Sequence, residues 1–380
     1  MTVSPATRRE IDEHWLRRCL VIAAQGRYTV SPNPMVGAVV VKDGKRISEG
    51  YHRRVGGPHA EREAFAGLTA EETSGATLYV SLEPCAHHGR TPPCIDAVLE
   101  SGIARVVSCQ ADPNEAVSGR SFQRLREAGV EVDVGLLAED AARLNLAFLT
   151  RHALGRPAVT LKWAMSLDGR IATSSGESQW ISSPAGRDWA LDLREEHDAI
   201  LVGSGTALAD DPRLDRRRGL AEGPICRVVL DRRLRIGGDA ALFSVGGPVI
   251  VFTGDHDPEA MEPLRKAGAE VVPLAEPSPS NVLEELAARD VQSLLVEGGG
   301  EILAAFAGEG LFDRVEVCCA PKLIGGESAP GPLRGAGVQR LADSEVLESL
   351  ESRVAGPDLI VSAIRRGAVS RLLSAGSPPT

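Results

Sequence analysis

Short apolar runs alternate with helix-like segments along nearly the whole of this 380-residue chain, and no other feature limits its fold as strongly. The run at 36–41 is continuously apolar, as expected for a strand buried on both faces, and 77–82 and 104–109 are predicted strands too. The segments 8–25 and 137–148 have the apolar spacing of helices. This alternation predicts an α/β fold with a largely parallel sheet between helices.

The alternation is interrupted at residues 149–157, where Pro157 cannot continue the preceding helix. A second α/β run follows. Its expected strands lie at 158–164, 199–202, 226–230, 248–253, 293–297, 314–320 and, in an antiparallel finish, 359–364. A chain of this length usually forms more than one domain. We therefore predict domains at 1–150 and 157–367, with a disordered tail at 368–380.

Composition narrows the possible partners. The net charge of −10 argues against a nucleic-acid-binding surface, which would be basic. The seven cysteines are odd in number and widely spaced, so a reducing cytoplasm fits better than a disulfide scaffold. No apolar run approaches the roughly 20 residues of a membrane span. Five cysteines are expected to be small core residues: Cys19, Cys109, Cys226, Cys318 and Cys319.

The strongest chemical signal is a set of metal-ligand residues in the first half. His59 and Glu61 are separated by one residue, and Cys85 and Cys94 follow. One His and two Cys supply three ligands to Zn²⁺ and leave the fourth position for water, as in catalytic zinc sites. Glu61 could move the water's proton to a leaving amine. This pattern is typical of zinc nucleobase deaminases, although their two cysteines are separated by two residues and these by eight.

Two other interpretations of this set remain open. In a structural zinc site, His87 or His88 would supply the fourth ligand, but Glu61 would then have no role. A nucleic-acid editor of the deaminase type would need a basic stripe beside the pocket, and residues 1–150 are close to neutral. The catalytic zinc site is the interpretation that uses all four residues.

Glycine-rich segments follow two expected strands of the second half. Residues 203–208 nearly match the dinucleotide-binding pattern G-x-G-x-x-G, but Leu208 occupies the third position, where Gly or Ala is needed. The segment Glu297-Gly-Gly-Gly300 precedes an apparent helix, where backbone N–H groups could bind a pyrophosphate. From spacing alone, a flexible connector is an equally good interpretation of it.

Longer motifs resemble a known family. The first half contains Ser31-Pro-Asn-Pro-Met-Val-Gly37, Pro58-His-Ala-Glu61 and Tyr79-Val-Ser-Leu-Glu-Pro-Cys-Ala-His-His-Gly-Arg-Thr-Pro-Pro-Cys94. The second contains Lys162-Trp-Ala-Met-Ser-Leu-Asp-Gly169, Gly176-Glu-Ser-Gln-Trp-Ile181, Asp210-Asp-Pro212 and Val296-Glu-Gly-Gly299. These motifs resemble the bifunctional deaminase/reductases of riboflavin biosynthesis, in the family's usual order. The resemblance implies a cytidine-deaminase-like three-layer α/β/α sandwich followed by a dihydrofolate-reductase-like α/β domain.

The resemblance also implies two reactions. The first domain would hydrolytically deaminate 2,5-diamino-6-ribosylamino-4(3H)-pyrimidinone 5′-phosphate, with Glu61 as proton shuttle and zinc on His59, Cys85 and Cys94. The second would use NADPH to reduce the ribosyl group to ribityl. The implied cofactor-binding residues are Ala164, Trp180, Thr206, Asp210, Gly299, Gly300, Glu301 and Ile302. The implied substrate-binding residues are Asn33, Ser178, Arg194, Leu214, Arg217 and Glu297, with the two arginines on the phosphate and Glu297 on the sugar hydroxyls.

The chain departs from the family pattern at three places. Gly119-Arg-Ser121 stands where the family has a Gly-x-Gly pair, and Asp215-Arg216 stands in place of Thr-Val. Arg232-Arg233 replaces a small polar residue, and we hypothesise that one of the two faces the 2′-phosphate of NADPH. The alternative function is a zinc deaminase of another nucleobase or nucleotide whose reductase-like domain is inactive. A homo-oligomer is possible through late antiparallel edge strands.

Overall fold

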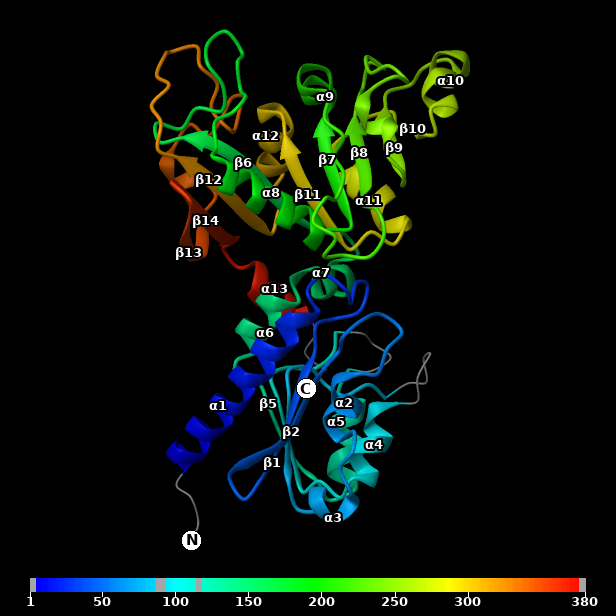
Figure 1. The fold of residues 1–380 in the computed structure, drawn as a ribbon, viewed down its shortest axis with the longest axis vertical. Helices are drawn as coiled ribbons and strands as arrows, with labels where there is room; N and C mark the ends of the chain where they lie inside the picture. The colour runs from blue at the N-terminus through cyan, green and yellow to red at the C-terminus, as the bar shows by residue number, and fades with distance from the viewer. Residues whose placement is uncertain (1–4, 87–92, 114–117, 376–380) are drawn as a thin grey trace. The chain divides into compact units, whose positions relative to one another are not determined.

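The computed structural model describes residues 5–86, 93–113 and 118–375, which form two compact units (Figure 1). One unit contains Met1–Gly155 and the C-terminal segment from Val369, and the other contains Arg156–Ala368. Each unit is built around one β-sheet. None of the helices in the described ranges is both long and apolar enough to cross a bilayer.

The first unit has a mixed five-stranded sheet, in the order β2-β1-β3-β4-β5. Its strands are β1 (Gly37–Lys42), β2 (Lys45–Tyr51), β3 (Thr77–Val80), β4 (Arg105–Ser108) and β5 (Glu131–Val134). Strand β1 is antiparallel to both of its neighbours, so the expectation of a largely parallel sheet is wrong for half of the pairings. The cause is the hairpin of β1 and β2, whose two-residue Asp43-Gly44 turn has positive φ at both positions.

Helices cover both faces of this sheet, which confirms the expected three-layer arrangement. They are α1 (Pro5–Ala23), α2 (Ala60–Phe65), α3 (Ala70–Thr73), α4 (Cys94–Glu100), α5 (Arg120–Glu127), α6 (Ala138–Leu144) and α7 (Leu146–Leu154). Val40 and Leu78 pack in one core with α2, α4 and α5, whereas Val39 and Tyr79 pack in the other with α1. Successive strand residues therefore serve opposite faces.

The helix expected at 137–148 is divided in two at Asn145. The side-chain amide of Asn145 bonds both backbone groups of Met35, with Oδ1 2.7 Å from the Met35 nitrogen and Nδ2 2.9 Å from its oxygen. The interruption thus anchors the segment that leads into β1.

The second unit contains a nine-stranded sheet in the order β10-β9-β8-β7-β11-β6-β12-β14-β13. Its strands are β6 (Ala158–Ser166), β7 (Ala199–Gly203), β8 (Cys226–Leu230), β9 (Val249–Thr253), β10 (Glu270–Pro273), β11 (Ser293–Gly298), β12 (Arg314–Ala320), β13 (Leu347–Ala355) and β14 (Asp358–Arg365). The seven strands from β10 to β12 pair in parallel. Strands β14 and β13 are antiparallel, as the sequence predicts for the finish.

Helices also cover both faces of the second sheet. They are α8 (Pro184–Glu196), α9 (Ser204–Asp210), α10 (Pro258–Lys266), α11 (Pro279–Ala288) and α12 (Gly300–Gly308). Leu201 and Val296 pack with α11 and α12, and Ile200 and Leu295 pack in the opposite core with α8 and α10. The carboxyl ends of the parallel strands β7, β8 and β11 meet at one edge, which is where α/β sheets bind ligands.

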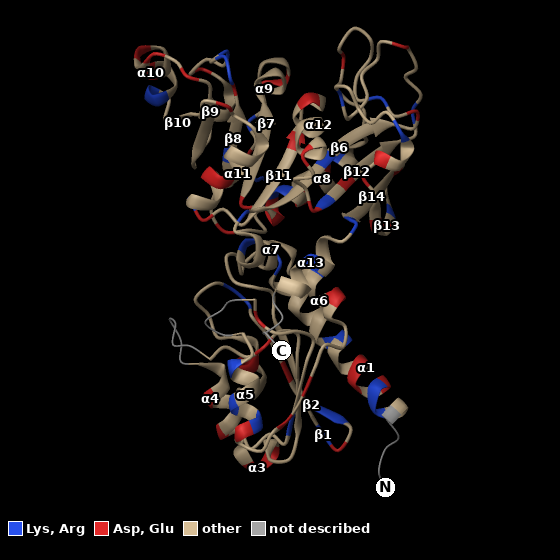
Figure 2. Ribbon diagram, turned by 180° about the vertical axis from the view of Figure 1, so that it is seen from behind, with Lys and Arg blue, Asp and Glu red and all other residues tan. Residues whose placement is uncertain are grey.

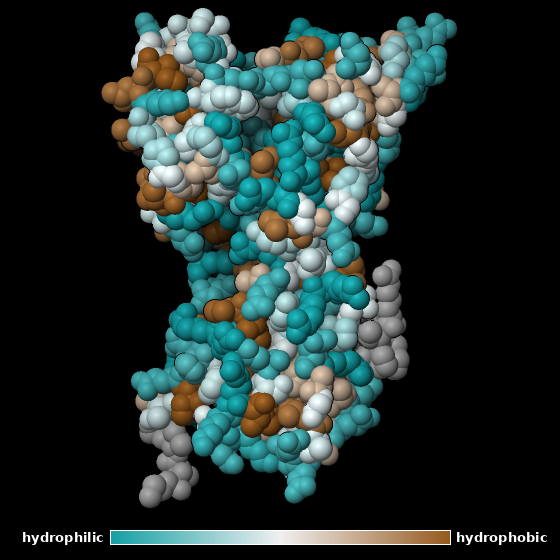
Figure 3. Space-filling view, viewed as in Figure 1, coloured by the Kyte–Doolittle hydropathy of each residue, from teal (hydrophilic) through white to brown (hydrophobic). Residues whose placement is uncertain are grey.

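Two long loops of this unit, after β6 and after β12, are hydrogen-bonded to each other. Asp168 accepts bonds from the backbone nitrogens of Ile324 (3.1 Å) and Gly325 (2.7 Å), and the Leu167 nitrogen donates to Lys322 O at 2.8 Å. Apolar side chains are exposed over these loops, among them Leu167 and Leu323 (Figure 3). The paired loops behave as one substructure because their backbones share these bonds.

The C-terminal segment is a helix where the sequence predicts a disordered tail. Helix α13 spans Ala368–Ala375, with Val369 and Leu372 buried. From Val369 onward the segment groups with the first unit, so the chain returns there after completing the second. The predicted disorder is therefore wrong for residues 368–375, because two apolar residues at helical spacing have a core to enter. Residues 376–380 lie outside the described ranges.

Two candidate active sites

The structure brings the three predicted metal ligands of the first unit together. His59 precedes α2, Cys94 is the first residue of α4, and Cys85 lies in the loop after β3. His59 Nδ1 lies 3.5 Å from Cys85 Sγ and 3.3 Å from Cys94 Sγ. All three ligand atoms lie within 4.8 Å of one another. A tetrahedral zinc with bonds of about 2.0 and 2.3 Å spaces its N and S ligands about 3.5 Å apart, so these residues fit the ion.

The two thiols of this cluster are electrostatically unequal. The Cys94 nitrogen donates to Cys85 Sγ at 3.2 Å. The Cys94 thiol, and then the neighbouring His59, lower the pKa of Cys85, whereas the shared proton and burial raise the pKa of Cys94. Cys85 therefore holds thiolate character readily, and thiolate is the form that binds metal.

Glu61 is the second residue of α2 and is buried beside the cysteines. Burial, reinforced by the negative charge of Cys85, raises the pKa of Glu61 to about 7. Its carboxyl interacts with the Cys94 thiol. A buried carboxyl next to three ligand atoms is well placed to exchange a proton with a group held there.

Glu83 holds the ligand-bearing loop in place. Its carboxylate accepts bonds from the backbone nitrogens of Asp112 (3.2 Å), Gly119 (2.9 Å) and Ser121 (3.0 Å). The Ser121 hydroxyl donates to Pro84 O at 2.5 Å, next to Cys85. The departure from the family pattern at Ser121 therefore adds a bond behind the metal ligands.

Asn33 is oriented by a histidine that the sequence analysis missed. Asn33 Nδ2 lies 3.0 Å from His52 Nε2, and His52 Nδ1 lies 2.9 Å from Pro58 O. Because Pro58 O can only accept, Nδ1 carries the His52 proton and Nε2 accepts from Asn33. The His52 and His59 rings are 5.3 Å apart, so Asn33 is held close to the ligand cluster. His87 and His88 lie outside the described residues.

The second unit contains a cavity of about 1410 Å³, and every cofactor and substrate residue predicted for this unit lines it. These residues are Ala164, Ser178, Trp180, Arg194, Thr206, Asp210, Leu214, Arg217, Glu297, Gly299, Gly300, Glu301 and Ile302. Pockets for one small ligand commonly measure about 300–1,000 Å³. The volume of this cavity therefore exceeds the usual range for one small ligand.

A buried ion cluster lies in the wall of this cavity. Arg194 binds Glu297 through two bonds, Nε–Oε1 at 3.0 Å and Nη2–Oε2 at 2.8 Å. Lys162 Nζ lies 4.0 Å from the same carboxylate. Although burial opposes ionisation, Arg194 and Lys162 lower the pKa of Glu297 to about 2. Lys162 was not predicted from the sequence as a site residue, and Arg194 was predicted to bind a phosphate and not Glu297.

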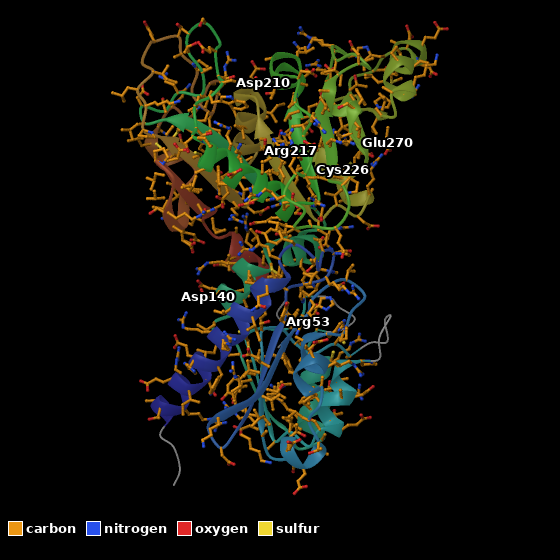
Figure 4. All side chains as sticks on the ribbon, viewed as in Figure 1. Arg53, Asp140, Asp210, Arg217, Cys226 and Glu270 are labelled. Atoms are coloured by element: carbon orange, nitrogen blue, oxygen red, sulfur yellow. The ribbon has the colours of Figure 1, made fainter. Side chains whose placement is uncertain are left out.

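The loop after α9 contains the second departure from the family pattern. Arg217 Nε lies 2.7 Å from Asp215 Oδ1, and Arg213 Nη2 lies 3.3 Å from Asp215 Oδ2. Asp215 lines a separate cavity of about 200 Å³, together with Arg216. Arg216 donates to Arg194 O (3.1 Å) and to His197 O (2.6 Å). Asp215 and Arg216 therefore hold this loop in position. Arg217, which is labelled in Figure 4, lines the large cavity with the Asp215 carboxylate beside it.

The glycine turn after β11 is closely packed. Gly299 has φ +82°, and a Cβ on Gly298 would lie 3.1 Å from Thr206 Oγ1. A Cβ on Gly203 would lie 2.8 Å from Ile302, so α9 and α12 approach each other at these two glycine positions. This packing argues against the flexible-connector interpretation of Glu297-Gly-Gly-Gly300 and leaves a fixed turn at the cavity wall.

Trp180 and Asp210 line the cavity from two different segments. Trp180 is 62% exposed, and the Arg187 guanidinium lies 4.7 Å from its ring centroid. Gln179 Nε2 donates to Asp210 Oδ1 at 3.1 Å and so ties the two segments together. An exposed aromatic ring on a cavity wall is a surface on which a flat ligand ring can stack.

Both halves of the chain match known families. Residues 157–361 match the RibD C-terminal domain, and residues 9–110 match the cytidine and deoxycytidylate deaminase zinc-binding region. The chain is 42% identical to the riboflavin biosynthesis protein RibD of Aquifex aeolicus, over 93% of this chain and 98% of the relative. It is 40% identical to the RibD of Escherichia coli K12, over 93% and 99%.

Solved structures give the same result. The structure of Acinetobacter baumannii RibD, form 1, aligns with a TM-score of 0.83 at 35% identity, over 94% of this chain and 99% of that one. A diaminohydroxyphosphoribosylaminopyrimidine deaminase/5-amino-6-(5-phosphoribosylamino)uracil reductase from Thermotoga maritima aligns with a TM-score of 0.81 at 36% identity, again over 94% and 99%.

Proposed function

This chain belongs to the RibD family and is a bifunctional deaminase and reductase of riboflavin biosynthesis, and we propose that each of its two units carries one activity. The match to the deaminase zinc-binding region falls within the first unit, and the RibD C-terminal match falls within the second. The substrate pair is taken to be that named for the Thermotoga maritima relative.

In the first unit, His59, Cys85 and Cys94 would hold a zinc ion, which when bound supplies an acidified water as the nucleophile. Glu61 accepts the proton of that water and returns it to the amine that leaves the pyrimidine ring. Asn33, oriented by His52, bonds the ring and presents the carbon that bears the amine. Glu83 and Ser121 keep Cys85 in position through the backbone.

In the second unit, NADPH would lie along the wall formed by Ala164, Trp180, Thr206, Asp210 and the Gly299–Ile302 turn. When bound, this cofactor supplies the hydride for C1′ of the opened ribosyl group. Glu297 stays ionised and accepts bonds from the sugar hydroxyls, while Ser178 and Leu214 line the substrate side. Arg217 is the main phosphate ligand, because its bond to Asp215 uses only Nε, whereas Arg194 binds Glu297 through both Nε and Nη2.

The observation that carries this proposal is the convergence of residues from the whole second half on one cavity, in a chain that also assembles the His59, Cys85 and Cys94 cluster. The test is mass spectrometry of the diaminopyrimidine ribosylamine phosphate after incubation with zinc-loaded protein. We expect an amine-to-oxygen exchange without NADPH, and a further gain of two hydrogens with it. Deamination without reduction would support the alternative of an inactive reductase domain. No change in either sample would refute the substrate.

We also propose the cellular compartment and the partners of the protein. All seven cysteines are free, which fits a reducing cytoplasm. Cys19, Cys109 and Cys318 are buried as expected for small core residues, whereas Cys226 and Cys319 are partly exposed. The partners are small phosphorylated pyrimidines, and self-association through the late strands remains part of the proposal.

A further inference from the structure

A tight turn at the carboxyl end of β8 presents two arginines to the large cavity. The Leu234 nitrogen donates to Asp231 O at 3.1 Å, so Arg232 and Arg233 are the two central residues of a four-residue turn. Both side chains are exposed and line the cavity. Arg235 lines it as well, so three of the four residues after Asp231 are basic and line the same cavity. Figure 2 shows a blue, basic stretch of ribbon beyond the labels β8 and β9.

The carboxylate of this turn is withdrawn from the cavity. Asp231 is fully buried, and its Oδ2 accepts the backbone nitrogens of Arg235 (2.6 Å) and Ile236 (2.8 Å). In dinucleotide-binding α/β proteins, an acidic residue at a strand end bonds the adenosine ribose 2′-hydroxyl of NAD, whereas an arginine there accommodates the 2′-phosphate of NADP. In this chain the Asp231 carboxylate is bonded to backbone nitrogens, and the guanidinium groups of Arg232 and Arg233 line the cavity instead.

The arginine turn is also rigid. Arg232 O accepts bonds from the Gly254 nitrogen (3.2 Å) and from His256 Nε2 (2.9 Å). Arg235 Nη2 donates to Ser204 Oγ at 2.7 Å, which ties the turn to the start of α9. Among the described residues, neither Arg232 nor Arg233 is paired with a carboxylate. Their donors are therefore free for a ligand on a preorganised backbone.

We propose that Arg232 and Arg233 bind the 2′-phosphate of the cofactor, with Arg235 adding positive charge, and thereby select NADPH over NADH. This inference rests on the proposed function, since it requires a nicotinamide dinucleotide in the large cavity. A phosphate monoester is a dianion whose oxygens match the guanidinium fork, and charge-assisted bonds of this kind are strong. The same phosphate chemistry could come from the pyrimidine substrate, and the experiment separates the two sources.

The test compares Arg232→Gln, Arg233→Gln and the double variant with the parent protein. Dissociation constants are measured for NADPH, NADH, 2′,5′-ADP and 5′-ADP in the absence of pyrimidine. Each single variant is expected to weaken NADPH and 2′,5′-ADP binding about tenfold or more, and to leave NADH and 5′-ADP within about twofold. Arg265→Gln is the matched control, because Arg265 is an exposed arginine of the same unit outside the cavity wall. Lysine at 232 or 233 should restore part of the preference.

Each of the other possible results contradicts either the inference or the proposed function. If the NADPH-to-NADH preference survives in the double variant, the inference is wrong. If the variants raise the KM for the pyrimidine substrate while cofactor binding is unchanged, the arginines hold the substrate phosphate and the inference is also wrong. If the parent protein binds neither dinucleotide, the proposed function itself fails. Equal binding of NADPH and NADH by the parent would refute the inference, because the protein would then not select NADPH, and would leave the proposed function standing.

Discussion

The two units differ in how much of the chain supplies the residues of each candidate site. In the first, the candidate metal ligands and Glu61 come from one stretch of chain, between His59 and Cys94, and the three ligand atoms lie within 4.8 Å of one another. In the second, the cavity residues extend from Lys162 to Arg334 and come from many loops and helix ends. Deamination needs one ion and one proton shuttle at fixed positions, whereas a dinucleotide brings its own chemistry and needs a long shaped surface.

The two sites also treat their key carboxyl groups differently. Burial beside Cys85 raises the pKa of Glu61, so that group can exchange a proton near neutral pH. At Glu297, Arg194 and Lys162 overcome the effect of burial and lower the pKa to about 2, so that group remains an anion. Similar burial therefore accompanies a raised pKa in one unit and a lowered pKa in the other, because the Cys85 sulfur lies beside Glu61 whereas Arg194 and Lys162 lie beside Glu297.

Substitution of Glu61 should distinguish the activities of the two units most clearly. We expect Glu61→Gln to lower the deamination rate about a thousandfold, because general acid–base catalysis contributes about 10²–10⁴. Reduction of the already deaminated substrate should be unchanged, and metal analysis should find the zinc content of the parent. Glu63→Gln is the control, since Glu63 forms a partly exposed ion pair with Arg53. A parallel loss of reductase activity would contradict the division of labour.

Substitution at Glu297 should affect the second unit alone. Glu297→Gln leaves the buried Arg194 without its counter-ion, and breaking a buried pair costs about 3–5 kcal/mol of unfolding free energy. The KM for the ribosyl substrate should rise as well. Unfolding followed by tryptophan fluorescence reports mainly this unit, which contains Trp163, Trp180 and Trp189, and replacing Trp15 of the first unit by Phe makes the signal specific. Unchanged stability would show that the pair has little net effect on folding.

The same carboxyl predicts a pH dependence. The pKa of Glu297 is about 2 in the folded chain and 4.5 ordinarily, so its contribution is complete above about pH 4.5 and is lost as the pH falls toward 2. Between pH 5 and pH 3 the parent should therefore lose more stability than Glu297→Gln. Denaturant titrations at several pH values measure both slopes. Parallel slopes would refute the depressed pKa.

Helix α13 offers a way to test where the C-terminal segment belongs. Leu372 is buried, and Leu372→Ala should cost about 2–3 kcal/mol of unfolding free energy through the cavity it leaves. The loss should appear in the unfolding of the first unit, where the segment is grouped, and should weaken zinc retention at elevated temperature. Arg371→Ala, an exposed neighbour, should change stability by less than about 0.5 kcal/mol. An effect confined to the second unit would contradict the grouping.

The Ser121 hydroxyl should have a smaller, local effect. Ser121→Ala leaves Pro84 O without its buried donor, and such a loss costs about 1–2 kcal/mol. Because Pro84 precedes Cys85, zinc affinity and deamination should fall several-fold. Ser101→Ala removes a comparable hydroxyl bond to Val98 O, at the other end of α4, and should leave zinc affinity unchanged. Equal zinc affinities in the two variants would mean that Ser121 has no positioning role.

Several elements were predictable from local patterns, and others were not. The strands of both sheets that are buried on two faces appear as apolar runs, and the antiparallel finish of the second sheet was predicted as well. Strand β2 was missed, although Asp43-Gly44 is a recognisable hairpin turn, because Lys45–Tyr51 is largely polar. Strand β13 is exposed along most of its length and has no apolar face to mark it. Its place depends on β14, its pairing partner.

The candidate sites likewise contain some residues that local sequence patterns predict and others that they do not. Residue type and spacing were enough to predict that His59, Cys85 and Cys94 form a cluster, because few residue sets bind zinc and these lie close together in the chain. His52 and Lys162 were missed, because a lone histidine or lysine carries no signal until its neighbours are known. Arg194 was recognised as a site residue, yet its bidentate pairing with Glu297 could not be foreseen.

The order of residues was thus sufficient for the α/β class, the two-part organisation and the ligands of the metal cluster, since each depends on interactions over short stretches of chain. The folded structure decided the rest. It paired Arg194 with Glu297, buried Asp231 so that arginines face the cavity, and returned α13 to the first unit. These outcomes depend on distances and burial between residues far apart in the chain, and such distances exist only after the sheets have formed.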